Sequence, residues 1–303
     1  MLLLSSCVGQ APRDTSKTAP SRSTGSGPSV TFRTSPTTTT APSSVNVYAG
    51  AGAGNLSAAA KRAKSLVYVP NNATDTVQVI DPKSFRVIAT YPTGREPQHV
   101  VPSWDMKTLW VNDDLGNNMV PINPITGMPG KPVNVEDPYN LYFTPDGAHG
   151  LVMAERLGRI DVHNPQTVAF ERSLAVPCDG VNHADYSRDL SFFVASCEFS
   201  GKLLVVERSA TKLISVIDLN NTKTPGATSP AEAMRMGGAK SGLTPGASAM
   251  PQDVRLSPDG TWFLVADMLR NGIWVISAST RKVERFIRTG MGACSRYLSS
   301  PRR

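Results

Sequence analysis

A repeated unit of about forty residues is the feature of this sequence that most restricts its fold. Each copy is marked by an aspartate before an apolar run, as in SWDMKTLWVN, TPDGAHGLVMA, SRDLSFFVAS and SPDGTWFLVAD. The markers are Asp105, Asp146, Asp189 and Asp259, and the steps between them are 41, 43 and 70 residues. Each unit holds short apolar runs separated by turn-forming residues, without the 3.6-residue period of a helix. Four strands per unit at this period predict the blades of an all-β propeller.

Composition divides the chain around these repeats. Residues 8–64 are rich in Ser, Thr, Pro and Ala and poor in large apolar side chains, so we expect a disordered linker. Residues 65–290 form the predicted propeller domain, and residues 291–303 an irregular tail. The long third step places a loop insertion at 222–248, which can be a lid, a partner-binding loop or simple disorder. Its methionines Met234 and Met236, with Met250 just beyond it, could offer soft ligands or apolar contacts.

The net charge of +7 does not belong to the predicted domain. Between Ser65 and Ser295 there are 21 Lys and Arg against 23 Asp and Glu, so the excess of positive charge lies towards the two ends of the chain. Basic tails can touch an anionic membrane or cell wall without reading a base sequence. We therefore expect no specific nucleic-acid partner.

The first residues resemble the processing site of a bacterial lipoprotein. Leu4, Ser5 and Ser6 precede Cys7 as an apolar residue and two small residues precede the lipidated cysteine of a lipobox. Only six residues stand before Cys7, which is short for an export signal. One interpretation is lipidation of Cys7 and anchoring outside the cytoplasm through that lipid alone; the other is an ordinary thiol near a frayed terminus. No run of 18 apolar residues is present to span a bilayer.

Two further cysteines, Cys178 and Cys197, fall within one repeat and flank an expected hairpin that turns near Asp189. If the hairpin pairs as its apolar pattern indicates, both thiols come near the same end of it, within reach of a disulfide. The alternative is a pair of buried, reduced cysteines. Cys294 has no apparent partner.

The stretch from Leu66 to Val100, LVYVPNNATDTVQVIDPKSFRVIATYPTGREPQHV, resembles the YVTN-type β-propeller repeat of bacterial proteins, with YVPNN in the place of YVTN. The similarity covers about 225 residues. In a secreted subgroup of that family paired cysteines recur in segments similar to CDGVNHADYSRDLSFFVASCEFSGKL, which implies a disulfide between Cys178 and Cys197. The family includes surface and periplasmic proteins without a known role, and related architectures carry lactonases and redox enzymes.

The resemblance implies seven blades, whereas this sequence supplies four full repeats and three strands between Leu66 and Tyr91. We therefore expect about five blades, as an incomplete, truncated ring. The alternative is a closed five-bladed ring in which Met291 to Leu298 adds the inner strand of the first blade.

Four polar residues occupy one repeat position, six residues before each marker aspartate. They are His99, Asn140, His183 and Asp253. Equal positions would place them in a ring at the entrance of the inner strands, where they could bind a small ligand, and His99, His183 and Asp253 could hold a divalent metal. The alternative is that each side chain only caps a local turn. His149 and His163 fall outside this ring and are expected in surface turns.

The predicted function is that of a binding or scaffold protein at the cell envelope, with a protein, a glycan or a small molecule as the partner. The alternative is a metal-dependent propeller enzyme, either a lactonase-like hydrolase or a redox enzyme. No G-x-S-x-G elbow, H-E-x-x-H motif or P-loop occurs in the sequence, so no catalytic residue is assigned.

Overall fold

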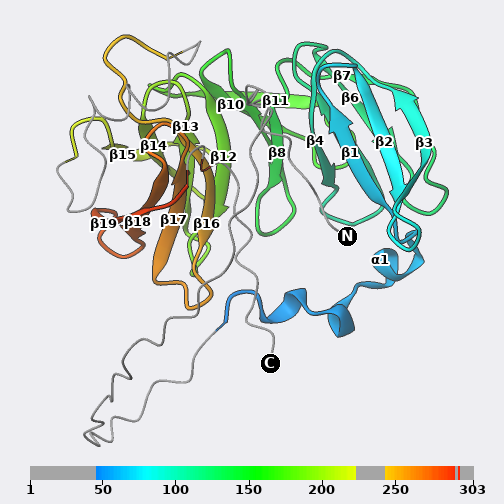
Figure 1. Cartoon of the computed structure of the whole chain (residues 1–303), viewed down its shortest axis with the longest axis horizontal. Coiled ribbons are helices and arrows are strands. Elements are labelled where there is room, and N and C mark those ends of the chain that lie inside the picture. The colour runs from blue at the N-terminus through cyan, green and yellow to red at the C-terminus, as the bar shows by residue number, and fades with distance from the viewer. Residues whose placement is uncertain (1–45, 223–242, 291–292, 294–303) are drawn as a thin grey trace, which may run out of the picture.

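The computed structural model describes residues 46–222, residues 243–290 and Ala293. Within them, strands form five antiparallel sheets, each wound in chain order (Figure 1). The first sheet has three strands: β1 (Val67–Asn71), β2 (Thr76–Asp81) and β3 (Arg86–Pro92). The second has β4 (Pro97–Pro102), β5 (Leu109–Asp113), β6 (Asn118–Ile122) and β7 (Val133–Asn134).

The remaining sheets repeat the four-stranded plan. The third contains β8 (Asn140–Phe143), β9 (Gly150–Ala154), β10 (Arg159–His163) and β11 (Phe170–Ala175). The fourth contains β12 (Val181–Tyr186), β13 (Phe192–Cys197), β14 (Lys202–Glu207) and β15 (Leu213–Asp218). The fifth contains β16 (Pro251–Leu256), β17 (Trp262–Asp267), β18 (Gly272–Ser277) and β19 (Val283–Arg288). The prediction of an all-β propeller with about five blades is confirmed.

The inner strands run side by side in chain order. β4 contacts β8, β8 contacts β12 and β12 contacts β16, while β1 contacts β4 from the first sheet. In sequence, YVPNN of β1 matches the second strand of the other blades, so in the described residues the first blade lacks an inner strand. The first and fifth sheets lie at opposite sides of the arrangement (Figure 1). The architecture is that of an incomplete propeller.

The apolar core lies between neighbouring blades. One cluster joins the third and fourth sheets through Leu151, Phe193 and other buried side chains, and another joins the fourth and fifth through Leu203 and Trp274. Full burial of such a side chain contributes about 1.5 to 3 kcal/mol. The outermost strands are largely exposed, as in β3 and β11. Most of the apolar stabilisation therefore comes from the faces that neighbouring blades pack against each other.

The marker aspartates of the repeat cap the turn after each inner strand. In all four cases the carboxylate accepts a hydrogen bond from the Ser or Thr hydroxyl two residues earlier, in the pairs Ser103–Asp105, Thr144–Asp146, Ser187–Asp189 and Ser257–Asp259. Gly147 and Gly260 take positive φ in these turns. Trp104 of the preceding blade packs against Gly147, and Arg188 packs against Gly260 in the same way. A Cβ at either glycine would collide with those side chains.

Residues 46–64 were predicted as the end of a disordered linker, but the structure gives them defined contacts. They form two short 3-10 helices, Ala49–Ala51 and Ala53–Asn55, and the helix α1 (Ala58–Arg62). At one end Val47 donates its N–H to the Pro258 carbonyl and Tyr48 its hydroxyl to the Leu256 carbonyl, at 2.8 and 2.6 Å. At the other, Lys64 donates its N–H to Pro124. This strap, residues 46–64, joins the fifth blade to the second (Figure 1).

Several predictions concern residues outside the described ranges. They are the lipobox at 1–7 with Cys7, linker residues 8–45, insertion residues 223–242 with Met234 and Met236, and the tail with Cys294. Of the methionines discussed above, Met250 is described; it is buried in an apolar cluster with Leu269. Among the helices of the described part, none has the length and apolar character needed to cross a membrane.

Candidate functional site

The inner strands β4, β12 and β16 each carry a β-bulge at the predicted site. The pairing with the second strand skips a residue between Pro97 and His99, between Val181 and Ala184, and between Pro251 and Val254. A bulge re-aims the side chains next to it. His99, His183 and Asp253 therefore lie where the strands depart from regular pairing, and Asn140 begins β8 at the matching place.

Three aromatic rings meet at this end of the inner strands. The His99 and His183 ring centroids are 5.3 Å apart, and Tyr139 lies 5.2 Å from His99 and 6.0 Å from His183. Nδ1 of His99 is 2.8 Å from the Tyr139 carbonyl oxygen, which can only accept, so this nitrogen carries the proton. His99 of the second blade and His183 of the fourth were predicted to come together and do so. Tyr139, from the third blade between them, is the third member. We call these three residues the ring cluster.

Both histidines of the ring cluster are neutral at ordinary pH. Burial, and then the neighbouring His183, lower the pKa of His99 to about 3. Burial and the nearby Arg255 guanidinium lower the pKa of His183 to about 3. Nδ1 of His183 is buried, and no group among the described residues forms a hydrogen bond with it. The imidazoles thus offer hydrogen-bonding nitrogens, not positive charges.

Two buried glutamates, Glu155 and Glu198, lie beside the ring cluster. Asn182 donates its side-chain N–H to Glu198 Oε2 at 2.7 Å, while its own Oδ1 accepts the His183 N–H and the Ser196 hydroxyl. Burial, and then the charge of Glu198, raise the pKa of Glu155 well above its usual range. Within the part of the chain that the structure describes, Oε1 of Glu155 has no hydrogen-bond partner. Both glutamates also raise the pKa of Tyr139 after the effect of its burial.

A second acidic pair, Asp114 and Asp137, continues this set towards the second blade. Arg156 donates Nε to Asp137 Oδ1 at 2.8 Å and lies 3.5 Å from Asp114 Oδ1. Burial, and then the contact with Asp137, raise the pKa of Asp114 to about 7. Asp114, Glu155 and Glu198 occupy the same repeat position, directly after the second strand of three successive blades. The end of the structure that holds the ring cluster is therefore rich in acceptors.

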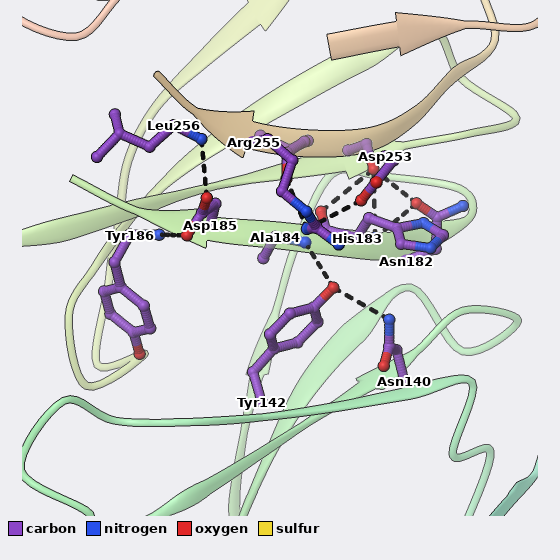
Figure 2. A network of polar contacts seen from close by, with 12 residues as sticks. Asn140, Tyr142, Asn182, His183, Ala184, Asp185, Tyr186, Asp253, Arg255 and Leu256 are labelled. Atoms are coloured by element: carbon purple, nitrogen blue, oxygen red, sulfur yellow. Dashed lines mark hydrogen bonds and ion pairs between the residues drawn. The ribbon is translucent and has the colours of Figure 1, made fainter. Parts of the chain in front are cut away.

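The other two predicted residues, Asn140 and Asp253, each pair with a side chain of their own strand, beside contacts that join neighbouring blades (Figure 2). Asn140 donates its side-chain N–H to the Tyr142 hydroxyl, which also accepts the Ala184 N–H of the next blade, both at 3.0 Å. Asp253 forms an ion pair with Arg255 at 2.9 Å. Asp185 accepts the Leu256 N–H at 2.8 Å, which joins the fourth blade to the fifth.

The residues predicted as metal ligands are His99, His183 and Asp253. Among residues 46–222, 243–290 and 293, no group of three or more His, Cys, Asp or Glu side chains is arranged to hold a metal ion. Asp253 is instead engaged by Arg255. The predicted set of His99, His183 and Asp253 thus finds no support as a metal centre in the described structure.

The remaining predictions have clear outcomes. Cys178 and Cys197 form a disulfide with a Cα–Cα distance of 5.4 Å. His149 pairs with Glu171 in a partly exposed position at the surface, as expected. His163 is buried in β10, with Nδ1 2.7 Å from the Val168 carbonyl, so its prediction as a surface residue is wrong.

Tyr139, Asp114, Glu155 and Glu198 were missed by the sequence analysis. The three acids follow the second strand at spacings of 41 and 43 residues, the same steps as the marker aspartates. That periodicity was the available signal. Tyr139 had none, because the matching residues of the other blades are Gln98, Asn182 and Gln252.

Four-stranded antiparallel sheets whose inner strands succeed one another around a common end define the β-propeller class. Sequence comparison agrees: residues 39–171 match the family model described as YNCE-like beta-propeller. No curated protein sequence matches the chain.

Solved structures show the same fold at low sequence identity. A functionally unknown protein from Desulfotomaculum acetoxidans is similar at 12% identity and a TM-score of 0.53, over 76% of this chain and 68% of that one. Virginiamycin B lyase from Staphylococcus aureus is similar at 12% identity and a TM-score of 0.51, over 73% of this chain. The chain spans 65% of the length of that lyase. At 12% identity these similarities show the fold alone.

Proposed function

We propose that this chain is a non-catalytic binding protein that acts outside the cytoplasm and holds a small polar ligand at the ring cluster. The meeting of His99, Tyr139 and His183 is the observation that carries the proposal. Bulges that turn side chains out of regular pairing are frequent next to binding sites. Three aromatic rings drawn from separate blades need a tertiary reason to converge, and ligand binding supplies one.

The groups around the cluster favour a ligand rich in hydrogen-bond donors. Neutral imidazoles contribute acceptor nitrogens, and Glu155 and Glu198 contribute carboxyl oxygens. An anionic ligand would face the carboxylates of the glutamates or acceptor nitrogens to which it could donate no hydrogen, and both effects disfavour its binding. An amine or a polyol would pair with these oxygens and nitrogens.

The sequence has four histidines, which makes the test direct. Imidazole Cε1–H signals can be followed by NMR during titration with glucosamine, glucose and glucuronate, and assigned with single His→Asn variants. We expect glucosamine or glucose to shift the signals of His99 and His183 without moving that of His149, and glucuronate to have no effect. A response confined to His149, or no response to any of the three sugars, contradicts the proposed site.

Export and anchoring are part of the same proposal. The Cys178–Cys197 disulfide supports an oxidising compartment, because such bonds are rare in the reducing cytosol. The lipobox-like sequence before Cys7 supports a lipid anchor. Incorporation of labelled palmitate into the wild type, lost in Cys7→Ser, would bear out the anchor. Incorporation that persists in Cys7→Ser would place the lipid elsewhere.

A further inference from the structure

A hollow between the fourth and fifth blades lies at the other end of the inner strands from the ring cluster. Its volume is about 760 Å³, and its walls include the turns after β12 and β16, with Ser187, Arg188 and Gly260. Because His183 stands near the start of β12 and Ser187 follows its last residue, the two sites lie at opposite ends of one strand. The hollow is large enough for a peptide or drug-sized ligand.

Three basic side chains line this hollow: Arg188, Lys212 and Arg281. In the described part of the chain none of them forms an ion pair, whereas Arg156, Arg159, Arg208 and Arg255 all do. Two of the three contact neighbouring groups. The aliphatic part of Arg188 lies against Gly260, and the Arg281 guanidinium lies 5.8 Å from the centre of the Phe192 ring.

The two acids in the same walls are already engaged by their own turns. Asp189 accepts hydrogen bonds from Ser187 and Ser191, and those bonds lower its pKa. Glu207 Oε2 accepts the Thr211 hydroxyl and the Ser209 N–H. These carboxylates stabilise local turns and make no ion pair with the basic residues of the hollow.

Apolar side chains lie beside the charges. Phe192 and Ile214 line the hollow, and Ile214 is 40% exposed. A second hollow of about 370 Å³ shares Ser187 and Arg188 with the first and adds Leu190, which is 45% exposed, and Tyr48 of the strap. Because the two hollows share Ser187 and Arg188, we treat them as one groove, lined by both cations and apolar side chains. Asp185 also lines the second hollow, where it accepts the Leu256 N–H.

We propose that this groove binds an extended acidic peptide segment that also carries apolar side chains, a site distinct from the ring cluster. Carboxylates of the segment pair with Arg188, Lys212 and Arg281, which lack acid partners in the described chain. Its apolar side chains cover Ile214 and Leu190. Arginine suits this role because its planar fork matches a carboxylate and it stacks on aromatic rings.

The test measures binding of a short, blocked, fluorescein-labelled peptide of alternating Glu and Leu by anisotropy. We expect the full chain to bind it, more weakly as salt is raised. Arg188→Gln with Arg281→Gln should weaken binding at least about tenfold, which corresponds to about 1.4 kcal/mol. The matched control is Lys83→Gln with Arg86→Gln, which makes the same charge change on exposed residues of the first blade. It should change affinity less than about twofold.

Two comparisons keep the outcome decisive. A peptide with Gln for Glu should lose binding, and one with Ala for Leu should bind less tightly. Equal loss in the groove variant and the control, or equal competition by alginate, a polyanion without apolar side chains, overturns the proposal. Thermal unfolding of both variants checks that they fold. His183→Asn should leave peptide binding unchanged, so this site can fail or stand independently of the ring cluster.

Discussion

The Tyr142 hydroxyl accepts the backbone N–H of Ala184 at 3.0 Å, so a side chain of the third blade completes the hydrogen bonding of the fourth. The N–H of Ala184 falls beside the bulge in β12, where regular pairing with β13 is interrupted. A buried N–H without an acceptor costs about 1 to 3 kcal/mol. The contact is therefore part of the structure that allows the bulge.

Replacing Tyr142 with Phe should lower the free energy of unfolding by about 1 to 3 kcal/mol, because Ala184 N–H and the Asn140 side-chain N–H both lose their acceptor. Urea unfolding measures the change. Tyr91→Phe is the control, since its hydroxyl contacts the Met128 sulfur at the surface. Equal effects of the two changes would mean that the Tyr142 contact has no special weight.

Removal of the disulfide by Cys178→Ala with Cys197→Ala should lower stability by about 3 kcal/mol, the value typical for a closed loop of this length. Chemical unfolding with and without a reducing agent measures it. Reducing agent should destabilise the wild type and leave the double variant unaffected. A wild type that is insensitive to reduction would contradict the bond.

Asp114 should make stability depend on pH. Its pKa in the folded chain is raised from 3.8 to about 7, so the folded state binds the proton more tightly than the unfolded state. The stabilisation of the folded state by the protonated Asp114 carboxyl is fully present below about pH 4 and is lost as pH rises through about 7.

Asp114→Asn should therefore flatten the decline of stability between about pH 4 and pH 7. The decline should not vanish, because burial also raises the pKa of Asp113 to about 7. Urea midpoints across this range provide the measurement. An unchanged slope in Asp114→Asn would show that the Asp114 carboxyl is not the titrating group.

Tyr48→Phe should free the strap from the fifth blade. The hydroxyl donates to the Leu256 carbonyl at 2.6 Å. Without this bond we expect the free energy of unfolding to fall by about 1 kcal/mol. Hydrogen exchange should quicken at the Val47 N–H while the Lys64 N–H stays protected by Pro124. Faster exchange at both places would indicate that the strap opens as a whole.

The fold was predictable because each blade repeats the same local chemistry. The Ser-x-Asp or Thr-x-Asp turns and the apolar runs after them occur in every full repeat, and both act over a few residues. The disulfide followed from the same strand pairing and from the family resemblance. Sequence periodicity therefore contained the architecture and the order of the blades.

The details of the site were not predictable in the same way. A bulge adds a residue without changing the apolar pattern, so the turn of His183 away from regular pairing left no trace in the repeat. Tyr139 replaces a polar residue of the other blades and enters the ring cluster only through tertiary contact. The strap is held partly through the backbone groups of Val47 and Lys64, which any sequence provides, and partly through the Tyr48 hydroxyl.

The strap also determines how mechanical load enters the molecule. Val47 and Tyr48 are bound to the fifth blade, although the strands that follow them in the chain belong to the first. Tension applied from the N-terminal side would act on Pro258 and Leu256 before it reached β1. A tether that pulls on this end would therefore apply force to the fifth blade first. The contacts of Val47 and Tyr48 would shield the first blade from that force.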